Sequence, residues 1–325
     1  MRTPSVLILL IALLLPANAA GNYAQRDDVK DFIHMMAKKH NYDSNELANW
    51  FQRAKRQEGT LKAIAKPAEG LAWYRYRKIF ITEERINKGV KFWNDYETEL
   101  NRAEQTYGVP AEIIVAIIGV ETFYGKHAGK YPVFDTLVTL GFDYPKRGKF
   151  FRSELEQYLL LIREESLDPF SLKGSYAGAV GKPQFISSSY RNYAIDFDGD
   201  GKRDLLNNTA DAIGSVANYF SRHGWKPGEA ITIRAKYKGN KAFPDFGMKP
   251  KKSVSQLSSH GLFPAQPVVS SALAAPIALE QEEHKEYWFG LHNFYVITRY
   301  NHSNLYAMAV YELSQLVKQQ RDQIR

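Results

Sequence analysis

Residues 110–121 read PAEIIVAIIGVE, the most hydrophobic helical stretch that follows the first 19 residues. Pro110 stands where the first turn of a helix tolerates proline. The side chains from Ile113 to Val120 are apolar on every side of such a helix, which is typical of a helix buried in a protein core. We therefore expect a buried α-helix at 110–121, with Glu121 at its carboxyl end.

Glu121 is the candidate catalytic residue. A carboxylate at the end of a buried helix is partly desolvated and feels the negative end of the helix dipole, and both effects favour its protonated form. A raised pKa is what a general acid requires near neutral pH. The alternative is a structural glutamate paired with a lysine such as Lys126, and the helix alone leaves both interpretations open.

The remaining pattern predicts a mainly α, α+β protein. Helices are expected at 28–39, 150–164, 209–223 and 304–320, and a further amphipathic stretch lies at 82–107. Asp43 followed by Glu46 resembles a capping box that opens another helix. A small β-containing insertion is expected between Trp225 and Tyr300. There, 231–237 alternates like a strand, 287–300 is aromatic and β-branched, and 263–276 is typical of a loop or linker.

The first 19 residues are interpreted as a signal peptide. Arg2 gives a positive start, Val6 to Leu15 form an apolar run, and Ala17-Asn18-Ala19 offers small residues for cleavage. The run is too short to span a bilayer, and no later segment approaches about 18 apolar residues. The chain contains no cysteine, so it has no thiol to which a lipid could be attached and cannot form a disulfide. We expect a soluble periplasmic protein cleaved near Ala19, with a retained anchor as the alternative.

The charge balance favours an anionic partner. The chain has 43 Lys+Arg and 35 Asp+Glu, and removal of Arg2 with the leader leaves 42 against 35, or +7. A basic exported protein is attracted to envelope polymers such as peptidoglycan with its peptide carboxylates. Nucleic-acid binding is not indicated, because we find no basic run interleaved with aromatic residues and no familiar nucleic-acid motif.

A cation-binding loop is predicted at 196–204, which reads DFDGDGKRD. Acidic residues occupy positions one, three, five and nine of the EF-hand pattern, and Gly201 makes the bend. Asp196, Asp198 and Asp200 supply carboxylates, and Lys202 offers its carbonyl. Position twelve is Asn207 instead of the usual glutamate. The alternative is a solvated acidic turn.

Five blocks of sequence resemble one known family. The run at 118–125, IGVETFYG, resembles the catalytic motif of lytic murein transglycosylases. Further similarity to the same family follows at 131–137, 174–185, 196–225 and 298–301. In this order the blocks are similar to the membrane-bound lytic transglycosylase B family and cover most of 21–316.

The resemblance implies a fold. It predicts a lysozyme-like core at about 108–225 plus 301–325, an N-terminal helical subdomain at about 24–107 and a small β subdomain at about 226–300. The catalytic region as a whole would then be 20–325. It also implies that the closing carboxylate of the stretched cation loop comes from the next helix, at Asp211. The bound ion would be a structural Ca²⁺, with no cofactor needed for catalysis.

The resemblance also implies an activity. Glu121 would protonate the glycosidic oxygen between N-acetylmuramic acid (MurNAc) and N-acetylglucosamine (GlcNAc). It would then take the proton from the 6-hydroxyl of MurNAc, leaving a 1,6-anhydro end. The implied substrate-binding residues are Ser175, Gln184, Asn301, Tyr76, Arg147, Tyr219 and Tyr306. Two positions depart from the family pattern: Lys146 stands where the family often has a second arginine, and Ile186-Ser187 replaces the usual Met-Pro that follows the glycine-rich loop.

Two other functions are compatible with parts of the sequence. A hydrolytic muramidase would need a second carboxylate, for which Asp135 is the nearest candidate. A non-catalytic peptidoglycan-binding scaffold would not need Glu121. The presence of this residue therefore does not favour the scaffold. A monomer that binds peptidoglycan strands, without a membrane span or nucleic acid, is the expected state.

Overall fold

The computed structural model describes residues 22–65, 70–240 and 242–324. The predicted leader at 1–19 lies outside these residues. The chain forms two compact units, with the boundary between Gln57 and Glu58. This boundary falls inside the helical subdomain expected at 24–107.

The first unit is a pair of helices preceded by a short 3₁₀ turn at Tyr23–Gln25. Helix α1 spans Asp27–His40 and α2 spans Ser44–Arg53. Asp43 caps α2, because its carboxylate accepts hydrogen bonds from the N–H groups of Asn45 and Glu46. The two helices bury their apolar faces against each other, with the rings of Phe32 and Phe51 5.9 Å apart in an edge-to-face contact.

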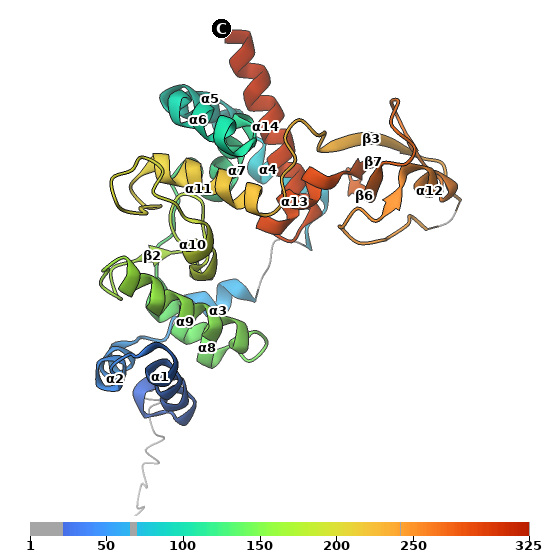
Figure 1. Ribbon diagram of the computed structural model, residues 1–325. Helices are drawn as coiled ribbons and strands as arrows, with labels where there is room; N and C mark the ends of the chain where they lie inside the picture. The colour runs from blue at the N-terminus through green and yellow to red at the C-terminus, as the bar shows by residue number, and fades with distance from the viewer. Residues whose placement is uncertain (1–21, 66–69, 241, 325) are drawn as a thin grey trace, which may run out of the picture. The chain divides into compact units, whose positions relative to one another are not determined.

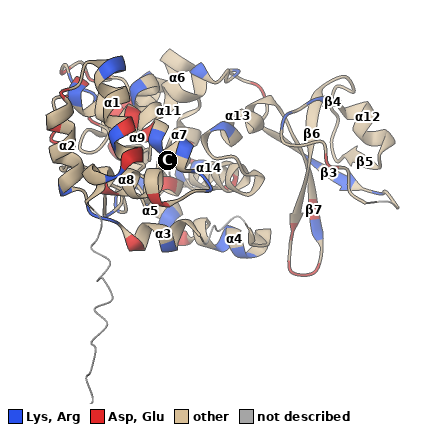
Figure 2. Cartoon of the chain, turned by 90° about the horizontal axis from the view of Figure 1, so that it is seen from below, with Lys and Arg blue, Asp and Glu red and all other residues tan. Residues whose placement is uncertain are grey.

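The second unit is built mainly from helices, shown with their labels in Figure 1. Their bounds are α3 Glu58–Ile64, α4 Trp73–Phe80, α5 Glu83–Asp95, α6 Glu97–Tyr107, α7 Ala111–Thr122, α8 Val133–Asp143, α9 Gly148–Glu164, α10 Ser187–Tyr193, α11 Thr209–Arg222, α12 Val254–Ser259, α13 His292–Tyr300 and α14 Asn304–Ile324. Basic and acidic residues are both spread over these helices, as the coloured cartoon shows (Figure 2).

Helix α7 is the centre of the second unit, as its composition predicts. It packs against α5, α6, α11 and α14, and every residue of α7 except Glu121 is buried. A helix that is apolar on all sides has no face for water, so it is stable only when other helices surround it. Among the described residues, no helix has the length and apolar character needed to cross a membrane.

The end of α7 is an unusual turn. Phe123, Tyr124 and Gly125 all have positive φ angles, of 53°, 61° and 89°. Non-glycine residues adopt this conformation rarely, and it persists only where the surroundings enforce it. Here Thr122 enforces it, because its Oγ1 accepts a hydrogen bond from the N–H of Gly125 at 2.9 Å. The chain therefore turns away directly after Glu121.

A curled antiparallel sheet forms the β-containing part. Its strands are β3 Thr232–Tyr237, β4 Lys252–Ser253, β5 Leu262–Pro264, β6 Leu273–Glu280 and β7 Lys285–Gly290, in the order β4-β6-β7-β3-β5. Strands β6 and β7 form a hairpin in which Ala275 pairs with Gly290 and Glu280 with Lys285. Helix α12 lies beside the sheet (Figure 1) and contributes Leu257 to a core shared with Ile233 and Phe289. A separate two-stranded ladder joins β1 (Tyr131–Pro132) to β2 (Lys173–Gly174).

Two local expectations are wrong. The segment 263–276 is not only a loop, because it contains the end of β5 and the start of β6. The segment 287–300 is strand only as far as Gly290 and continues as α13 from His292. The buried Asn293 explains the change, since its side chain bonds the N–H of Lys226 and the carbonyls of Lys226 and Glu229. Tertiary contacts thus override the β-branched composition.

Candidate active site

Glu121 lies in the last turn of α7, partly exposed, and receives a hydrogen bond from Tyr306. The Tyr306 hydroxyl donates to Glu121 Oε1 at 2.5 Å. Burial raises the pKa of Glu121 to about 7, and the bond from Tyr306 opposes this rise. Lys126 does not pair with Glu121, and its Nζ lies instead over the Phe123 ring at 5.6 Å. The carboxyl group therefore has the proton affinity expected of a general acid near neutral pH.

A group of tyrosines forms one wall of the site. The rings of Tyr306 and Tyr300 are nearly parallel, with centroids 6.4 Å apart, and those of Tyr300 and Tyr219 are 4.8 Å apart. Burial and the Glu121 charge raise the pKa of both Tyr300 and Tyr306 well above the ordinary value. The buried Tyr76 acts electrostatically on Tyr306, which places it near the same wall. These hydroxyl groups stay protonated and are able to donate hydrogen bonds.

The glycine-rich loop is fastened to the end of α7. Thr122 Oγ1 donates to the carbonyl of Lys182 at 2.9 Å, and the Tyr300 hydroxyl donates to the carbonyl of Pro183 at 2.5 Å. Both bonds attach the residues directly before Gln184, one to α7 and one to α13. The structure thereby brings Gln184 close to the elements that carry Glu121 and Tyr300.

The two polar residues of this loop are held in defined conformations. The Ser175 hydroxyl accepts hydrogen bonds from the N–H groups of Ala177 and Ala179. Gln184 has a positive φ of 51°, and its Nε2 donates to the carbonyls of Ala128 and Gly181. Within the described residues, Gln184 Oε1 makes no hydrogen bond. This acceptor and the Ser175 hydroxyl proton are available to a ligand.

The other predicted substrate residues lie at varied positions. Asn301 follows Tyr300 directly at the end of α13 and is partly buried. The hydroxyl of Tyr219 donates to the carbonyl of Arg299 at 2.6 Å, which joins α11 to the end of α13. Arg147 is exposed at the start of α9, with its guanidinium 4.3 Å from the centre of the Phe150 ring. No contact in the described residues joins Arg147 to Glu121.

The structure gives no support to a second catalytic carboxylate. Asp135 is buried on α8, where its charge acts on Tyr158. Among the described residues, no carboxylate contributes to the pKa of Glu121. The Glu121 carboxyl group therefore has no charged carboxylate acting on it within the described chain.

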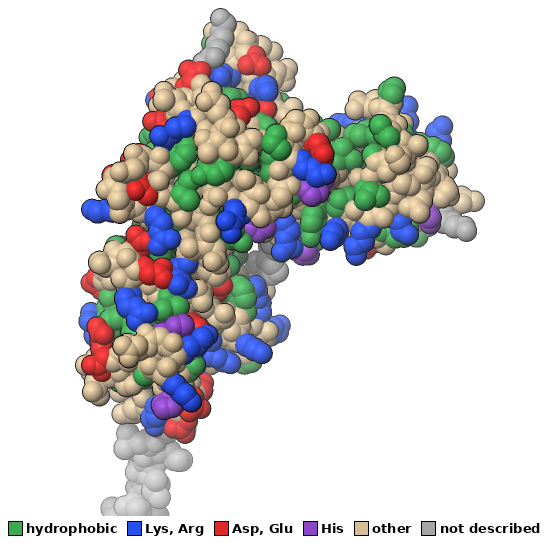
Figure 3. All heavy atoms as spheres, in the orientation of Figure 1, with side chains coloured by type: hydrophobic (Ala, Val, Ile, Leu, Met, Phe, Trp, Pro, Cys, Tyr) green, Lys and Arg blue, Asp and Glu red, His purple; other side chains and the backbone are tan. Residues whose placement is uncertain are grey.

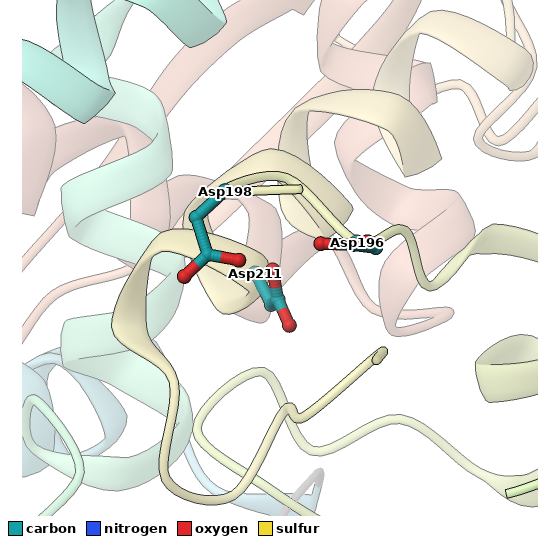
Figure 4. A group of neighbouring side chains, drawn as sticks. All are labelled: Asp196, Asp198 and Asp211. Atoms are coloured by element: carbon teal, nitrogen blue, oxygen red, sulfur yellow. The ribbon is translucent and has the colours of Figure 1, made fainter. Parts of the chain in front are cut away.

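Three of the predicted cation ligands converge. Asp196, Asp198 and Asp211 place carboxylate oxygens within 4.8 Å of one another, as Figure 4 shows. Asp211 is fully buried in the first turn of α11 and accepts hydrogen bonds from the N–H groups of Phe197 and Asp204. Asp200 is not in this group of three, and its carboxylate accepts a hydrogen bond from the N–H of Lys202. Three clustered carboxylates, one of them fully buried, fit a hard divalent cation.

One relationship in the site has no signal in the sequence. Tyr306 was expected to pack against a sugar ring, and in the structure its hydroxyl contacts the candidate catalytic carboxyl. The two residues are 185 positions apart, and no local pattern links them. Similarly, nothing near Lys182 in the sequence indicates that its carbonyl binds Thr122.

Comparisons with known proteins agree over most of the chain. A family model described as the transglycosylase SLT domain matches residues 24–315. Membrane-bound lytic murein transglycosylase B of Escherichia coli (strain K12) is 47% identical over 307 residues, which cover 91% of this chain and 84% of that protein. Catenated lytic transglycosylase SltB1 from Pseudomonas aeruginosa superposes with a TM-score of 0.88 at 46% identity, covering 92% of this chain and 99% of that one. Escherichia coli lytic transglycosylase Slt35, solved in complex with calcium, gives a TM-score of 0.86 at 47% identity and covers 93% and 96%.

Proposed function

The chain belongs to the transglycosylase SLT domain family and is a peptidoglycan lytic transglycosylase, and from this premise we propose that Glu121 is its single acid/base catalyst. The family expectation drawn from the sequence blocks is confirmed, as is the lysozyme-like fold. The enzyme cleaves the β-1,4 bond between MurNAc and GlcNAc and leaves 1,6-anhydro-MurNAc ends.

In the first step Glu121 donates its proton to the glycosidic oxygen. With a pKa of about 7, the carboxyl group is protonated in a large fraction of molecules near neutral pH. As the proton leaves, negative charge develops on the carboxylate. The Tyr306 hydroxyl already points at Oε1 and stabilises this charge without any rearrangement.

In the second step the Glu121 carboxylate takes the proton from the 6-hydroxyl of the same MurNAc. The bond from the anomeric carbon to the GlcNAc oxygen breaks, and a bond from the anomeric carbon to O6 forms. The net proton transfer runs from O6 to the leaving oxygen through Glu121, and no water is consumed. Hydrolytic glycosidases use two carboxylates, whereas here the substrate's own hydroxyl replaces water and its N-acetyl group assists.

The polar residues around Glu121 hold the MurNAc unit. Ser175 and Gln184 hydrogen-bond the sugar through their available donor and acceptor, and Asn301 orients the assisting acetamido group. Tyr76, Tyr219 and Tyr306 form the wall against which sugar rings pack. Arg147 meets carboxylates of the substrate from its exposed position.

One observation carries this proposal. Glu121 is the only residue of α7 that is not buried, its pKa lies near neutrality, and no other carboxylate acts on it within the described chain. Mass spectrometry of the products released from purified cell-wall sacculi tests it. Anhydro ends are expected, and abundant reducing ends would instead identify a hydrolytic muramidase.

We further propose that Asp196, Asp198 and Asp211 bind a structural Ca²⁺, as part of a loop in which the EF-hand pattern also includes Asp200 and Lys202. Three supports are the convergence of the carboxylates, the burial of Asp211, and the similar Escherichia coli enzyme solved in complex with calcium. A cation here neutralises mutually repelling carboxylates and joins the loop to α11. The ion takes no part in the reaction.

The proposed organisation keeps the three parts that the resemblance implies. All five strands of the curled sheet lie within 226–300, which supports a β subdomain there, beside a helical subdomain at about 24–107 and a core at about 108–225 and 301–325. We also propose that the enzyme is exported to the periplasm, is cleaved near Ala19 and acts as a monomer.

On the face drawn in Figure 3, basic side chains are interspersed with acidic and apolar ones rather than gathered into one patch.

A further inference from the structure

Three positive side chains surround the ring of Phe123. The Arg85 guanidinium lies 4.8 Å from the ring centre, Lys88 Nζ lies 4.4 Å from it and Lys126 Nζ lies 5.6 Å from it. Cations are attracted to the face of an aromatic ring, so Phe123 holds together charges that would otherwise repel each other. We call Arg85, Lys88, Lys126 and Phe123 the Phe123 cluster.

The cluster carries excess positive charge. Glu84 pairs with Lys88 at 3.0 Å, and the pKa of Glu84 is lowered by Lys88 first and also by Lys126 and Arg85. Three cations and this one carboxylate leave a net charge of +2. Within the described residues Lys126 has no ion-pair partner, and it is exposed. An anion that approaches the Phe123 ring can therefore pair with the ammonium group of Lys126, whose charge is not neutralised by a carboxylate.

Arg85 gives the cluster a rigid side. It is half-buried, and its guanidinium donates to the carbonyl of Gly119 at 3.1 Å and to that of Ile79 at 2.5 Å. Gly119 lies one turn before Phe123 on the helix that carries Glu121. The charge is thus fixed in position relative to the catalytic helix.

The cluster adjoins the candidate active site in two ways. Phe123 follows Glu121 by two residues, and the same segment continues to Ala128, whose carbonyl accepts a hydrogen bond from Gln184. On the other side, Arg85 also lies over the Phe80 ring at 5.4 Å, and Phe80 contacts Tyr76 of the tyrosine wall at 5.2 Å. The cluster therefore borders the site through the Phe123–Ala128 segment and through α4.

The chemistry of the substrate supplies an anion next to this border. The N-acetylated sugars of the glycan are uncharged, and the lactyl carboxyl of each MurNAc is joined to the stem peptide as an amide. The negative charges of the substrate are therefore carboxylates of the stem peptide. An arginine and a lysine beside an apolar ring suit a peptide carboxylate with its aliphatic neighbours.

We propose that the Phe123 cluster binds a carboxylate of the stem peptide attached to the MurNAc that is being cleaved. This inference rests on the proposed function of Glu121. The cluster favours peptide-bearing strands over strands without peptides, and it does so at a place distinct from Arg147, which lies at the start of α9.

Lys126 is the residue to change, because it is exposed and its side chain makes no hydrogen bond in the described chain, whereas the Arg85 guanidinium also donates to two carbonyls. The variants are Lys126→Gln and Lys126→Glu. Lys130→Gln and Lys130→Glu are matched controls, since Lys130 is an exposed lysine on the same segment that lies beside Tyr131 at 5.9 Å and outside the cluster. The substrates are sacculi-derived strands with stem peptides and the same strands after an amidase has removed them.

The measured quantity is kcat/KM on peptide-bearing strands divided by kcat/KM on denuded strands. Lys126→Gln is expected to lower this ratio about two- to fivefold, the range of a single exposed ion pair, and Lys126→Glu to lower it further, both mainly through KM. Added salt should lower the ratio for the wild type and have less effect on Lys126→Glu, because salt screens exposed charges. The Lys130 variants should keep the wild-type ratio.

An unchanged ratio in both Lys126 variants, or an equal fall in the Lys130 variants, would overturn the inference. Cleavage of denuded strands by the wild-type enzyme is measured in the same series. It reports on the proposed function of Glu121 independently, because those strands carry no stem peptide.

Discussion

The hydroxyl of Tyr306 donates a hydrogen bond to Glu121 Oε1 at 2.5 Å. The bond joins the final helix α14 to the end of the central helix α7, and it lowers a pKa that burial alone would raise further. Tyr306 therefore both positions the carboxyl group that we propose as the catalyst and influences the pH range in which that group holds its proton.

Replacing Tyr306 with phenylalanine should shift the alkaline limb of the pH profile. Loss of the bond removes an influence that lowers the pKa, so the Glu121 pKa rises above about 7 and the proton is retained to higher pH. The rate on the plateau should fall, because the carboxyl group is less well oriented. The measurement is kcat/KM against pH on soluble glycan strands.

Tyr300→Phe is the matched control for this shift. Tyr300 lies in the same wall, but its hydroxyl bonds the carbonyl of Pro183 and not Glu121. Its alkaline limb should stay closer to that of the wild type. Equal shifts in the two variants would show that the bond to Glu121 is not responsible.

Glu121→Gln should abolish the reaction. Glutamine keeps the size of the side chain and can still accept the bond from Tyr306, but it cannot release and recover a proton. General acid–base catalysis contributes about 100- to 10,000-fold, and both halves are lost together, so activity should fall at least to the upper end of that range. The assay is release of 1,6-anhydromuropeptides from sacculi, and a folded variant within tenfold of the wild type would contradict the mechanism.

The same substitution should stabilise the fold at alkaline pH. The folded-state pKa of Glu121, about 7, is above the ordinary value of 4.5, so ionisation favours the unfolded chain. This destabilisation is absent below pH 4.5, grows as the pH rises and is complete above pH 7. A difference of about 2.5 between the two pKa values corresponds to at most about 3–4 kcal/mol, and the effect is smaller because the carboxyl group is partly exposed.

Melting temperatures of wild type and Glu121→Gln at a series of pH values measure this effect. The variant should melt higher than the wild type at pH 8, and the two should converge near pH 4.5. A wild type that is the more stable protein at pH 8 would mean that Glu121 is not strained by its burial.

Calcium should raise the melting temperature of the enzyme. A cation that binds only the native state stabilises it by about 2.7 kcal/mol at a hundredfold excess over its Kd. Asp198→Asn should remove most of this rise, because Asp198 belongs to the converging carboxylates. An identical melting curve with calcium and with a chelator would contradict the proposed site.

Asp200→Asn compares the two descriptions of the cation loop. The EF-hand pattern includes Asp200, whereas the structure leaves it outside the group of three. A calcium response that survives Asp200→Asn and not Asp198→Asn assigns the site to the three converging carboxylates. Loss of the response in both variants indicates that the loop closes around the ion with Asp200 included.

The export prediction concerns residues 1–19. N-terminal sequencing of the protein recovered from cells should find a start near Ala20, in a periplasmic fraction released without detergent. The cleavage site follows from Ala17-Asn18-Ala19, and the absence of cysteine leaves no thiol for a lipid. Recovery of a protein that begins at Met1 in salt-resistant association with membranes would contradict it.

Much of the fold, and the position of the candidate catalytic residue at the end of a buried helix, could be predicted from local sequence. The helix at 110–121 follows from composition alone, since a stretch that is apolar on all sides must be buried, and a carboxyl group at its end must then be partly desolvated. The motif blocks identified the family and with it the lysozyme-like core. Local pattern was insufficient where the same residue types suit both a strand and a helix. The aromatic and β-branched segment at 287–300 divides into β7 and α13, because Asn293 finds its hydrogen-bond partners in the loop after α11.

The sequence by itself determined that Glu121 ends a buried helix, that acidic residues cluster at 196–204 and that the chain carries excess positive charge. Only the tertiary structure decided which groups act on those residues. Tyr306 donates a hydrogen bond to Glu121 across 185 positions, Asp200 lies outside the group formed by Asp196, Asp198 and Asp211, and Arg85 of α5 and Lys126 both lie over the ring of Phe123. The physical reason is that local composition reveals which helix must be buried, whereas a hydrogen bond or a group of cations around one ring requires distant segments to be placed within a few ångströms of each other.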